Sequence, residues 1–270
     1  MERFLKSYVV TAYAFMYLPI AVVALFSLNA SRMIAFPLQG LTTDWYSDVL
    51  HDDRLLGGFL VTLLVAIPTA IIAMALGAMA ALAATRYRFR AKSLFLLLLA
   101  IPFFIPKIIL AVSDLILLAD LGIAKSVVTI VIAQSLIILP FTTLVVASVL
   151  IRIDPQIEEA AADLGASSWA IFLRVQLPLM RNGLIAASFV GFVLSSSEYV
   201  VTAFLSGRTQ PLSILVASDF RFNLSPTLDA LSILIVVLNM ALVAIGEFVR
   251  FRVNEVKSDV GRDSSAIEFR

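Results

Sequence analysis

Long apolar runs separated by short polar segments make up most of this chain of 270 residues. A helix needs about 20 mostly apolar residues to cross a membrane, and each run is long enough. The pattern predicts six membrane-spanning helices, at residues 8–28, 58–85, 93–119, 126–151, 183–205 and 228–249. We therefore expect an all-α polytopic membrane protein. Its membrane domain covers 8–249, between an N-terminal tail, 1–7, and a charged C-terminal tail, 250–270, expected to be partly disordered.

The first run has one alternative interpretation, a cleaved leader peptide, because Ser27-Leu-Asn-Ala30 ends in small residues. The apolar core of a leader is about 7–15 residues long, and this run is longer. A retained span is the expectation.

Small residues and prolines mark special positions within the spans. In the second span Ala73, Gly77 and Ala81 recur at every fourth position, a pattern that lets two membrane helices approach closely. The third span contains Pro102 and Pro106, and proline interrupts helical hydrogen bonding. We expect a tightly packed second span and a broken third one.

Composition restricts the chemistry. The chain is 61% hydrophobic and 14% charged, far from the balance of a soluble domain. It has no cysteine and a single histidine, His51, so thiol chemistry, a Ser-His-Asp triad and a Cys/His metal site are excluded. No phosphate-binding G-x-x-x-x-G-K-[ST] loop occurs either. We therefore expect no catalytic residues, no metal site, no cofactor in this chain and no nucleic-acid partner.

Basic residues are distributed unequally over the two sides of the membrane. One side carries fourteen Lys and Arg residues, in the tails and in the segments 86–92 and 152–182, and the other side carries five. Cytoplasmic loops are enriched in Lys and Arg. Both termini and the segment 152–182 are therefore expected in the cytoplasm.

The polar segment 154–178 reads as two short helices joined by a bend. Asp154 is suited to cap the first helix, and Gly165 to end it in a left-handed conformation. Ser167 or Ser168 is suited to cap the second helix, which we expect to end at Pro178. An ordinary connector between two spans is the alternative.

Three polar residues fall in one layer of the membrane. At about 1.5 Å per helical residue, Lys107 lies roughly 22 Å beyond Lys92, Glu198 roughly 26 Å beyond Arg181, and Gln134 roughly 27 Å from Arg152. Charges at this depth are costly and are usually functional. Either the three residues line a solute pathway, or Lys107 and Glu198 form a structural ion pair.

The serines next to Glu198 leave a similar choice. Ser197, with Ser195 and Ser196, either lines the same cavity or bonds back to the carbonyls of the preceding helical turn. We include Ser197 among the expected pathway residues.

The segment 154–178 resembles the EAA loop of ABC-importer permeases. That pattern is Glu-Ala-Ala, three residues, Gly, nine residues and Ile-x-Leu-Pro. Here it runs Glu159-Ala160-Ala161, then Gly165, then Val175-Gln-Leu-Pro178, departing only by valine for isoleucine. The resemblance implies a coupling helix that seats in a groove of a cytoplasmic ATPase, with its core at Glu159, Ala160, Ala161 and Gly165.

Nearly the whole chain resembles the second permease subunit of spermidine/putrescine-type importers, in the segments 41–46, 86–90, 162–167, 200–207 and 224–226. The resemblance implies the type I ABC-importer (MetI-like) permease fold in a bacterial inner membrane. It also implies partners: a second permease subunit, in a heterodimer, two ATPase subunits that carry ATP and magnesium, and an external solute-binding protein.

Two departures from that subfamily concern the solute. The polyamine permeases have an acid where this chain has Lys107, and two adjacent aspartates where it has Ser197 and Glu198. A lysine repels a polycation. We therefore expect an anionic or zwitterionic organic solute, such as an opine, an aminophosphonate or a chelate, with a polyamine as the alternative.

The expected function is that of a permease subunit that moves this solute by alternating access and is not itself an enzyme. Two other classes remain. A passive channel would leave the polar segment 154–178 unexplained, and a membrane-embedded enzyme would have to work with Lys107 and Glu198 alone.

Overall fold

The structure, a computed structural model, describes residues 2–32, 35–222, 225–241 and 244–246. The predicted C-terminal tail, 250–270, lies outside this range. The elements are α1 (Glu2–Phe26), α2 (Asp44–His51), α3 (Asp53–Arg86), α4 (Lys92–Phe104), α5 (Lys107–Asp120), α6 (Val127–Leu150), α7 (Gln156–Asp163), α8 (Ser168–Ile171), the π-helical turn η1 (Phe172–Gln176), α9 (Leu177–Ser196), α10 (Val200–Leu205) and α11 (Leu212–Phe222). A final helix runs over Pro226–Gly246.

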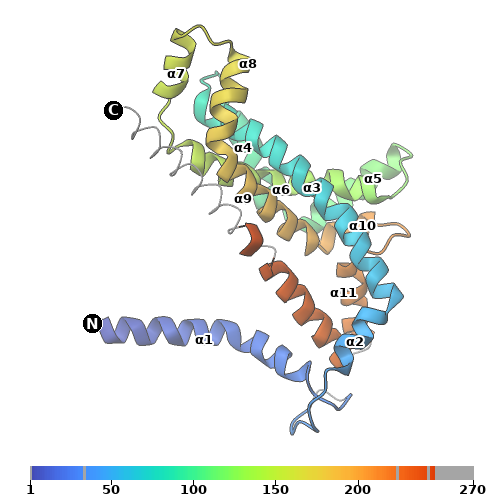
Figure 1. Cartoon of the computed structure of the whole chain (residues 1–270). Helices are drawn as coiled ribbons and strands as arrows, with labels where there is room; N and C mark the ends of the chain where they lie inside the picture. The colour runs from blue at the N-terminus through green and yellow to red at the C-terminus, as the bar shows by residue number, and fades with distance from the viewer. Residues whose placement is uncertain (1, 33–34, 223–224, 242–243, 247–270) are drawn as a thin grey trace, which may run out of the picture.

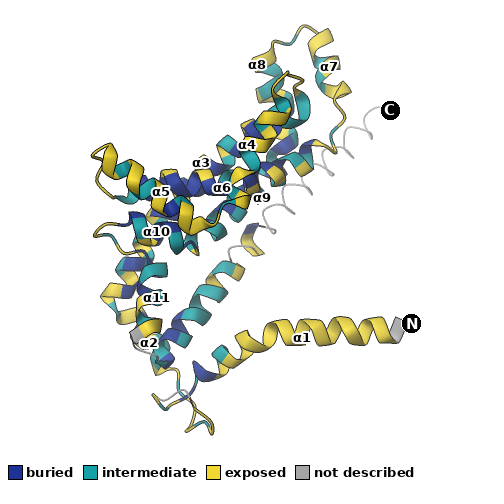
Figure 2. Cartoon of the chain, turned by 180° about the vertical axis from the view of Figure 1, so that it is seen from behind, coloured by how far each residue is buried: buried dark blue, intermediate teal, exposed yellow. Residues whose placement is uncertain are grey.

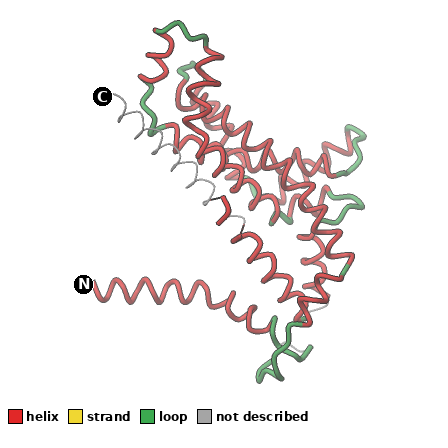
Figure 3. Tube along the Cα trace, viewed as in Figure 1, coloured by secondary structure: helices red, strands yellow, loops and turns green. Residues whose placement is uncertain are grey.

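The fold is helical through the described residues, as predicted (Figure 3). Five helices there are long and apolar enough to cross a membrane, and α4 with α5 makes a sixth crossing if this bent pair counts as one span. The first helix starts earlier than the predicted span. Helix α1 begins at Glu2, so residues 2–7 of the predicted tail continue the helix instead of preceding it.

Helices α3, α6 and α9 pack together as the centre of the molecule (Figure 1). Ala73, Gly77 and Ala81 are all buried on α3, which confirms that this face of small residues allows close packing. The hydroxyl of Thr142 on α6 donates to the carbonyl of Ala73 at 2.7 Å. A Cβ built on Gly77 would lie 2.3 Å from Thr142 Oγ1, so the absence of a side chain permits this contact.

Replacing Gly77 by alanine should therefore destabilise the protein, because the added carbon forces α3 and α6 apart. Overpacking of this kind costs about 1–3 kcal/mol. Gly57 on the same helix is the matched control, since a Cβ built there meets nothing within 4 Å. Gly57→Ala should be neutral or stabilising, because alanine favours a helix over glycine by about 1 kcal/mol. Thermal unfolding in detergent compares the two, and equal transition temperatures would contradict the packing argument.

The third span is broken, as its prolines predict. Helix α4 ends at Phe104, and Ile105 adopts an extended backbone, the conformation that a following proline favours. Helix α5 begins at Lys107 after Pro106, and the two axes differ by 103°. The break brings Lys107 to the first turn of a new helix.

The fifth span differs from the uninterrupted helix expected over residues 183–205. Helix α9 ends at Ser196, and the separate helix α10 starts at Val200. Glu198 lies in the break between them, where polar side chains satisfy backbone groups that a continuous helix would pair internally.

Helix α1 extends away from the other helices and is exposed along most of its length (Figure 2). Along this length its apolar side chains lack cover from the other residues that the structure describes.

Candidate functional site

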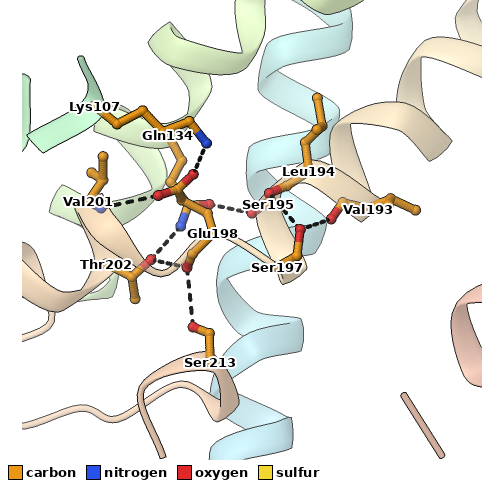
Figure 4. Close-up of polar contacts among 10 residues, drawn as sticks. All are labelled: Lys107, Gln134, Val193, Leu194, Ser195, Ser197, Glu198, Val201, Thr202 and Ser213. Carbon is orange, nitrogen blue, oxygen red and sulfur yellow. Dashed lines mark hydrogen bonds and ion pairs between the residues drawn. The ribbon is translucent and has the colours of Figure 1, made fainter. Parts of the chain in front are cut away.

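Two charged residues from the two broken spans meet inside the molecule (Figure 4). The Nζ of Lys107 lies 2.5 Å from Oε2 of Glu198. The Glu198 side chain is 7% exposed and that of Lys107 is 52% exposed. The carboxylate is thus buried in the protein, whereas the Lys107 side chain is half-exposed and reaches the carboxylate through its flexible methylene chain.

The local backbone holds the Glu198 carboxylate in place. Its Oε1 accepts the N–H of Val201 at 3.2 Å, in the first turn of α10. The N-terminus of a helix carries partial positive charge, so this position stabilises a carboxylate. The carbonyl of Glu198 accepts the hydroxyls of Thr202, at 2.7 Å, and Ser213, at 3.2 Å.

Gln134 joins this site from α6 through a chain of hydrogen bonds. Its Nε2 donates to Thr202 Oγ1 at 2.8 Å, and its Oε1 accepts the hydroxyl of Ser195. Gln134 is 1% exposed, so these bonds satisfy an amide that would otherwise be buried without partners. We call Lys107, Gln134, Ser195, Glu198 and Thr202 the charged cluster. The single layer expected for Lys107, Gln134 and Glu198 is therefore a connected network.

The three serines are divided between the two expected arrangements. Ser195 belongs to the charged cluster, but the hydroxyls of Ser196 and Ser197 donate to the carbonyl of Val193, at 3.1 and 2.8 Å. Ser197 also lines a neighbouring pocket of about 70 Å³ that reaches Thr62. The structure thus separates Ser197 from the other three expected pathway residues.

A pocket of about 40 Å³ adjoins the charged cluster and is lined by Lys107, Gln134 and Glu198 together with apolar side chains. This volume accommodates a few water molecules and no organic solute. Within the described range no three His, Asp or Glu side chains gather in a way that could hold a metal ion.

The segment 154–178, which we call the elbow, forms the far tip of the molecule at α7 and α8 (Figure 1). Asp154 accepts the N–H of Gln156, the first residue of α7, at 3.0 Å, although the N-cap position is Pro155, one residue later than expected. Gly165 ends α7 with φ +83°, the predicted left-handed conformation. Ala166 N–H donates to the carbonyl of Ala161 at 3.1 Å and Gly165 N–H to that of Ala162 at 2.9 Å, the two bonds of a Schellman motif.

The second half of the elbow departs from the prediction. Ser167 caps α8 by accepting the N–H of Ala170 at 3.3 Å, but the helix does not end at Pro178. It continues through the π-helical turn η1 into α9, with Pro178 in the first turn of α9. The N–H of Leu177 donates to the carbonyl of Phe172, five residues back. This shift in register lets the chain pass a residue that has no N–H.

The tip of the elbow is exposed, including Glu159, Ala160 and Gly165, while Ala161 is partly covered (Figure 2). Two apolar side chains are solvent-exposed there, Leu164 at 90% and Trp169 at 68%. Both side chains are therefore accessible to a partner that binds the tip.

Two residues of the charged cluster and the elbow were not predicted as functional from the sequence. Thr202 lies four residues after Glu198, so helical spacing was an available signal. Glu158 in the elbow forms an ion pair with Arg86, 72 residues away, for which the sequence offers no local signal.

Comparisons with known proteins agree with this architecture. Residues 54–255 match the family described as binding-protein-dependent transport system inner membrane component. The chain is 33% identical to the spermidine/putrescine transport system permease protein PotC of Escherichia coli (strain K12), over 92% of this chain and 94% of that protein. It is 31% identical to the putrescine transport system permease protein PotI of the same organism, over 83% and 82% of the two chains.

A solved structure shares the fold. It is a bacterial ABC transporter involved in the import of the acidic polysaccharide alginate, and its matching chain superposes with a TM-score of 0.67. The match covers 89% of this chain and 94% of that one at 17% identity, so it bears on the fold alone.

Proposed function

The chain belongs to the family of binding-protein-dependent transport system inner membrane components, and from this membership we propose how its two polar sites serve import. It is a permease subunit of an ABC importer of the spermidine/putrescine type, a multi-pass protein of the bacterial inner membrane, and it is not an enzyme. Such a permease works with ATPase subunits and an external binding protein. The observation that carries the proposal is the 33% identity to a permease over 94% of that relative.

The elbow is the contact with the ATPase in this proposal. Glu159, Ala160, Ala161 and Gly165 lie at or beside the exposed tip, and Pro178 lies where the elbow passes into α9. The exposed Leu164 and Trp169 side chains support docking of the elbow into an apolar groove. ATP and magnesium would bind to the partner ATPases, with no cofactor in this chain.

The complete importer would contain two ATPase subunits and a second, distinct permease chain. The uncovered length of α1 supports a permease partner, because an apolar helix that its own chain leaves exposed can pack against another. The charge asymmetry supports an orientation with both termini and the elbow in the cytoplasm.

The solute pathway would pass the charged cluster, with Lys107, Gln134 and Glu198 as contacts and Ser197 beside it. The pocket of about 40 Å³ must widen before a solute can enter, which agrees with alternating access. ATPase closure would move the elbow and, with it, the spans that surround this pocket.

The proposed solute is a polyamine, the alternative of the sequence analysis. The anionic or zwitterionic expectation was based on Lys107 and on Ser197 and Glu198 in place of two aspartates, and the comparisons do not confirm it. Glu198 pairs with Lys107 and offsets its charge, which weakens the argument against a polycation. Both named relatives transport polyamines according to their names, spermidine/putrescine and putrescine. A half-exposed lysine can withdraw and leave the buried carboxylate to a solute ammonium group.

A thermal-shift measurement on the cognate binding protein tests the solute class. Spermidine or putrescine should raise its unfolding temperature, because a ligand at about 100 times its Kd stabilises by about 2.7 kcal/mol. An opine and an aminophosphonate at the same concentration should leave it unchanged. Stabilisation by the acidic compounds alone would contradict the polyamine proposal.

A further inference from the structure

A second buried ion pair lies at the cytoplasmic end of the bundle, at the base of the elbow. Arg86 Nε donates to Glu158 Oε1 at 2.7 Å, and Gln176 Nε2 donates to the other carboxylate oxygen of Glu158 at 2.7 Å. The Arg86 and Glu158 side chains are 8% and 15% exposed. Both oxygens of one carboxylate are therefore held by side chains from two other elements.

These contacts connect the elbow to α3 and to the segments that precede and follow it in the chain. Arg86 is the last residue of α3, Glu158 belongs to α7, and Gln176 belongs to η1, which continues into α9. Arg86 Nη2 also donates to the carbonyl of Ile153, in the loop that follows α6, at 2.9 Å. Helix α7 itself packs chiefly on α8 and η1, so the Glu158 side chain is its tie to α3.

The position of Glu158 allows this contact to link movement of the elbow to α3. The next residue, Glu159, is exposed on the tip, while Glu158 points inward to Arg86. Helix α3 then runs 34 residues to the other side and packs against α6 and α9, which carry Gln134 and Ser195 of the charged cluster. A displacement of α7 would therefore reach α3 through this ion pair, in addition to reaching α9 along the continuous chain through η1.

A purely structural staple is the simpler alternative. Buried ion pairs are weak stabilisers, because the cost of removing both charges from water offsets their attraction. Their best-supported use is to specify one arrangement among several. An ion pair that keeps α7 in one position relative to α3 while the elbow moves would serve that use.

We propose that Arg86 and Glu158, with Gln176, are positioning residues that transmit the movement of the elbow to α3. The inference rests on the proposed function. It assigns to the Arg86 side chain a role in coupling ATP hydrolysis to transport, in addition to its contribution to the positive charge of its loop.

The experiment uses the complete importer in proteoliposomes, with its permease pair, ATPases and binding protein, and measures spermidine taken up per ATP hydrolysed. Glu158→Gln and Arg86→Gln should lower this ratio about tenfold, within the usual range of coupling energies, while ATP hydrolysis continues. The exchanged pair, Arg86→Glu with Glu158→Arg, should recover much of the ratio. Gln176→Met is a milder variant that leaves both charges paired, and it should lower the ratio about threefold.

The pair Arg54–Asp219 is the matched control, because it joins the other end of α3 to α11. Arg54 is 52% exposed, and such surface pairs contribute little, so Arg54→Gln should change the ratio by less than about twofold. The inference is contradicted if the Arg86 and Glu158 variants assemble and keep the wild-type ratio, or if the control lowers it equally. A wild-type importer without ATP-driven uptake would instead contradict the proposed function.

Discussion

Replacing Gly165 by valine should lower the solute moved per ATP about tenfold while the ATPases continue to turn over. Gly165 holds φ +83° at the Schellman turn between α7 and α8. A left-handed conformation costs an ordinary residue roughly 1–2 kcal/mol and a β-branched residue more, and about 1.4 kcal/mol changes a population tenfold. The measurement is the ratio of uptake to hydrolysis in the reconstituted importer.

The cause of this effect can be separated from simple crowding. A Cβ built on Gly165 meets nothing within 4 Å in the described part of the chain, so the backbone angle is the only obstacle there. Gly165→Asn is the control, because asparagine tolerates the left-handed region. It should retain most of the wild-type ratio. Normal coupling in Gly165→Val would show that the bend does not have to be preserved.

Replacing Glu198 by glutamine should reduce polyamine uptake by about tenfold or more. The carboxylate is the buried anion of the charged cluster, and a hydrogen bond to a charged group contributes about 1.5–3 kcal/mol. Lys107→Gln should have the opposite effect and lower the KM for spermidine, because it removes the cation that competes for Glu198. Initial uptake rates at several spermidine concentrations measure both changes.

Asp114→Asn is the matched control for these variants. It removes a carboxylate from α5, the helix that carries Lys107, without touching the ion pair. Uptake should change by less than about twofold, as expected for a charge that contacts no solute. If Lys107→Gln abolishes spermidine uptake, or improves uptake of an acidic solute, the assignment of Glu198 to a solute ammonium is wrong.

The sequence predicted the spans well because long apolar runs have few alternatives to membrane helices. It predicted one of the two broken spans and missed the other. Pro106 correctly predicted the break in the third span, since proline acts locally on the residue before it. The break at Glu198 has no such marker, because it depends on contacts with Val201, Thr202 and Ser213 that exist only in the fold.

The elbow was predicted in its first half and misread in its second. Asp154, Gly165 and Ser167 each form hydrogen bonds with their own chain neighbours, so these local bonds follow from local sequence. Pro178 was expected to end a helix, but the π-helical turn η1 accommodates it. The tie between Arg86 and Glu158 joins residues 72 positions apart, and one sequence alone carries no signal for it.

The solute class shows the same limit. Lys107 and Glu198 were placed at similar depth, and the sequence left open whether they line a solute pathway or pair with each other. Their pairing at 2.5 Å offsets the charge of Lys107, on which the expectation of an anionic or zwitterionic solute partly rested. Charge at a buried site has to be judged together with its partner.

Uptake of labelled spermidine into proteoliposomes that contain the complete importer tests the central claim most directly. The proposal predicts accumulation only when the loaded binding protein is outside and ATP is supplied to the ATPase side, with no uptake when ATP is replaced by ADP. Purification of this chain without an associated ATPase, together with spermidine uptake that is indifferent to ATP, would contradict the proposal and indicate a passive channel.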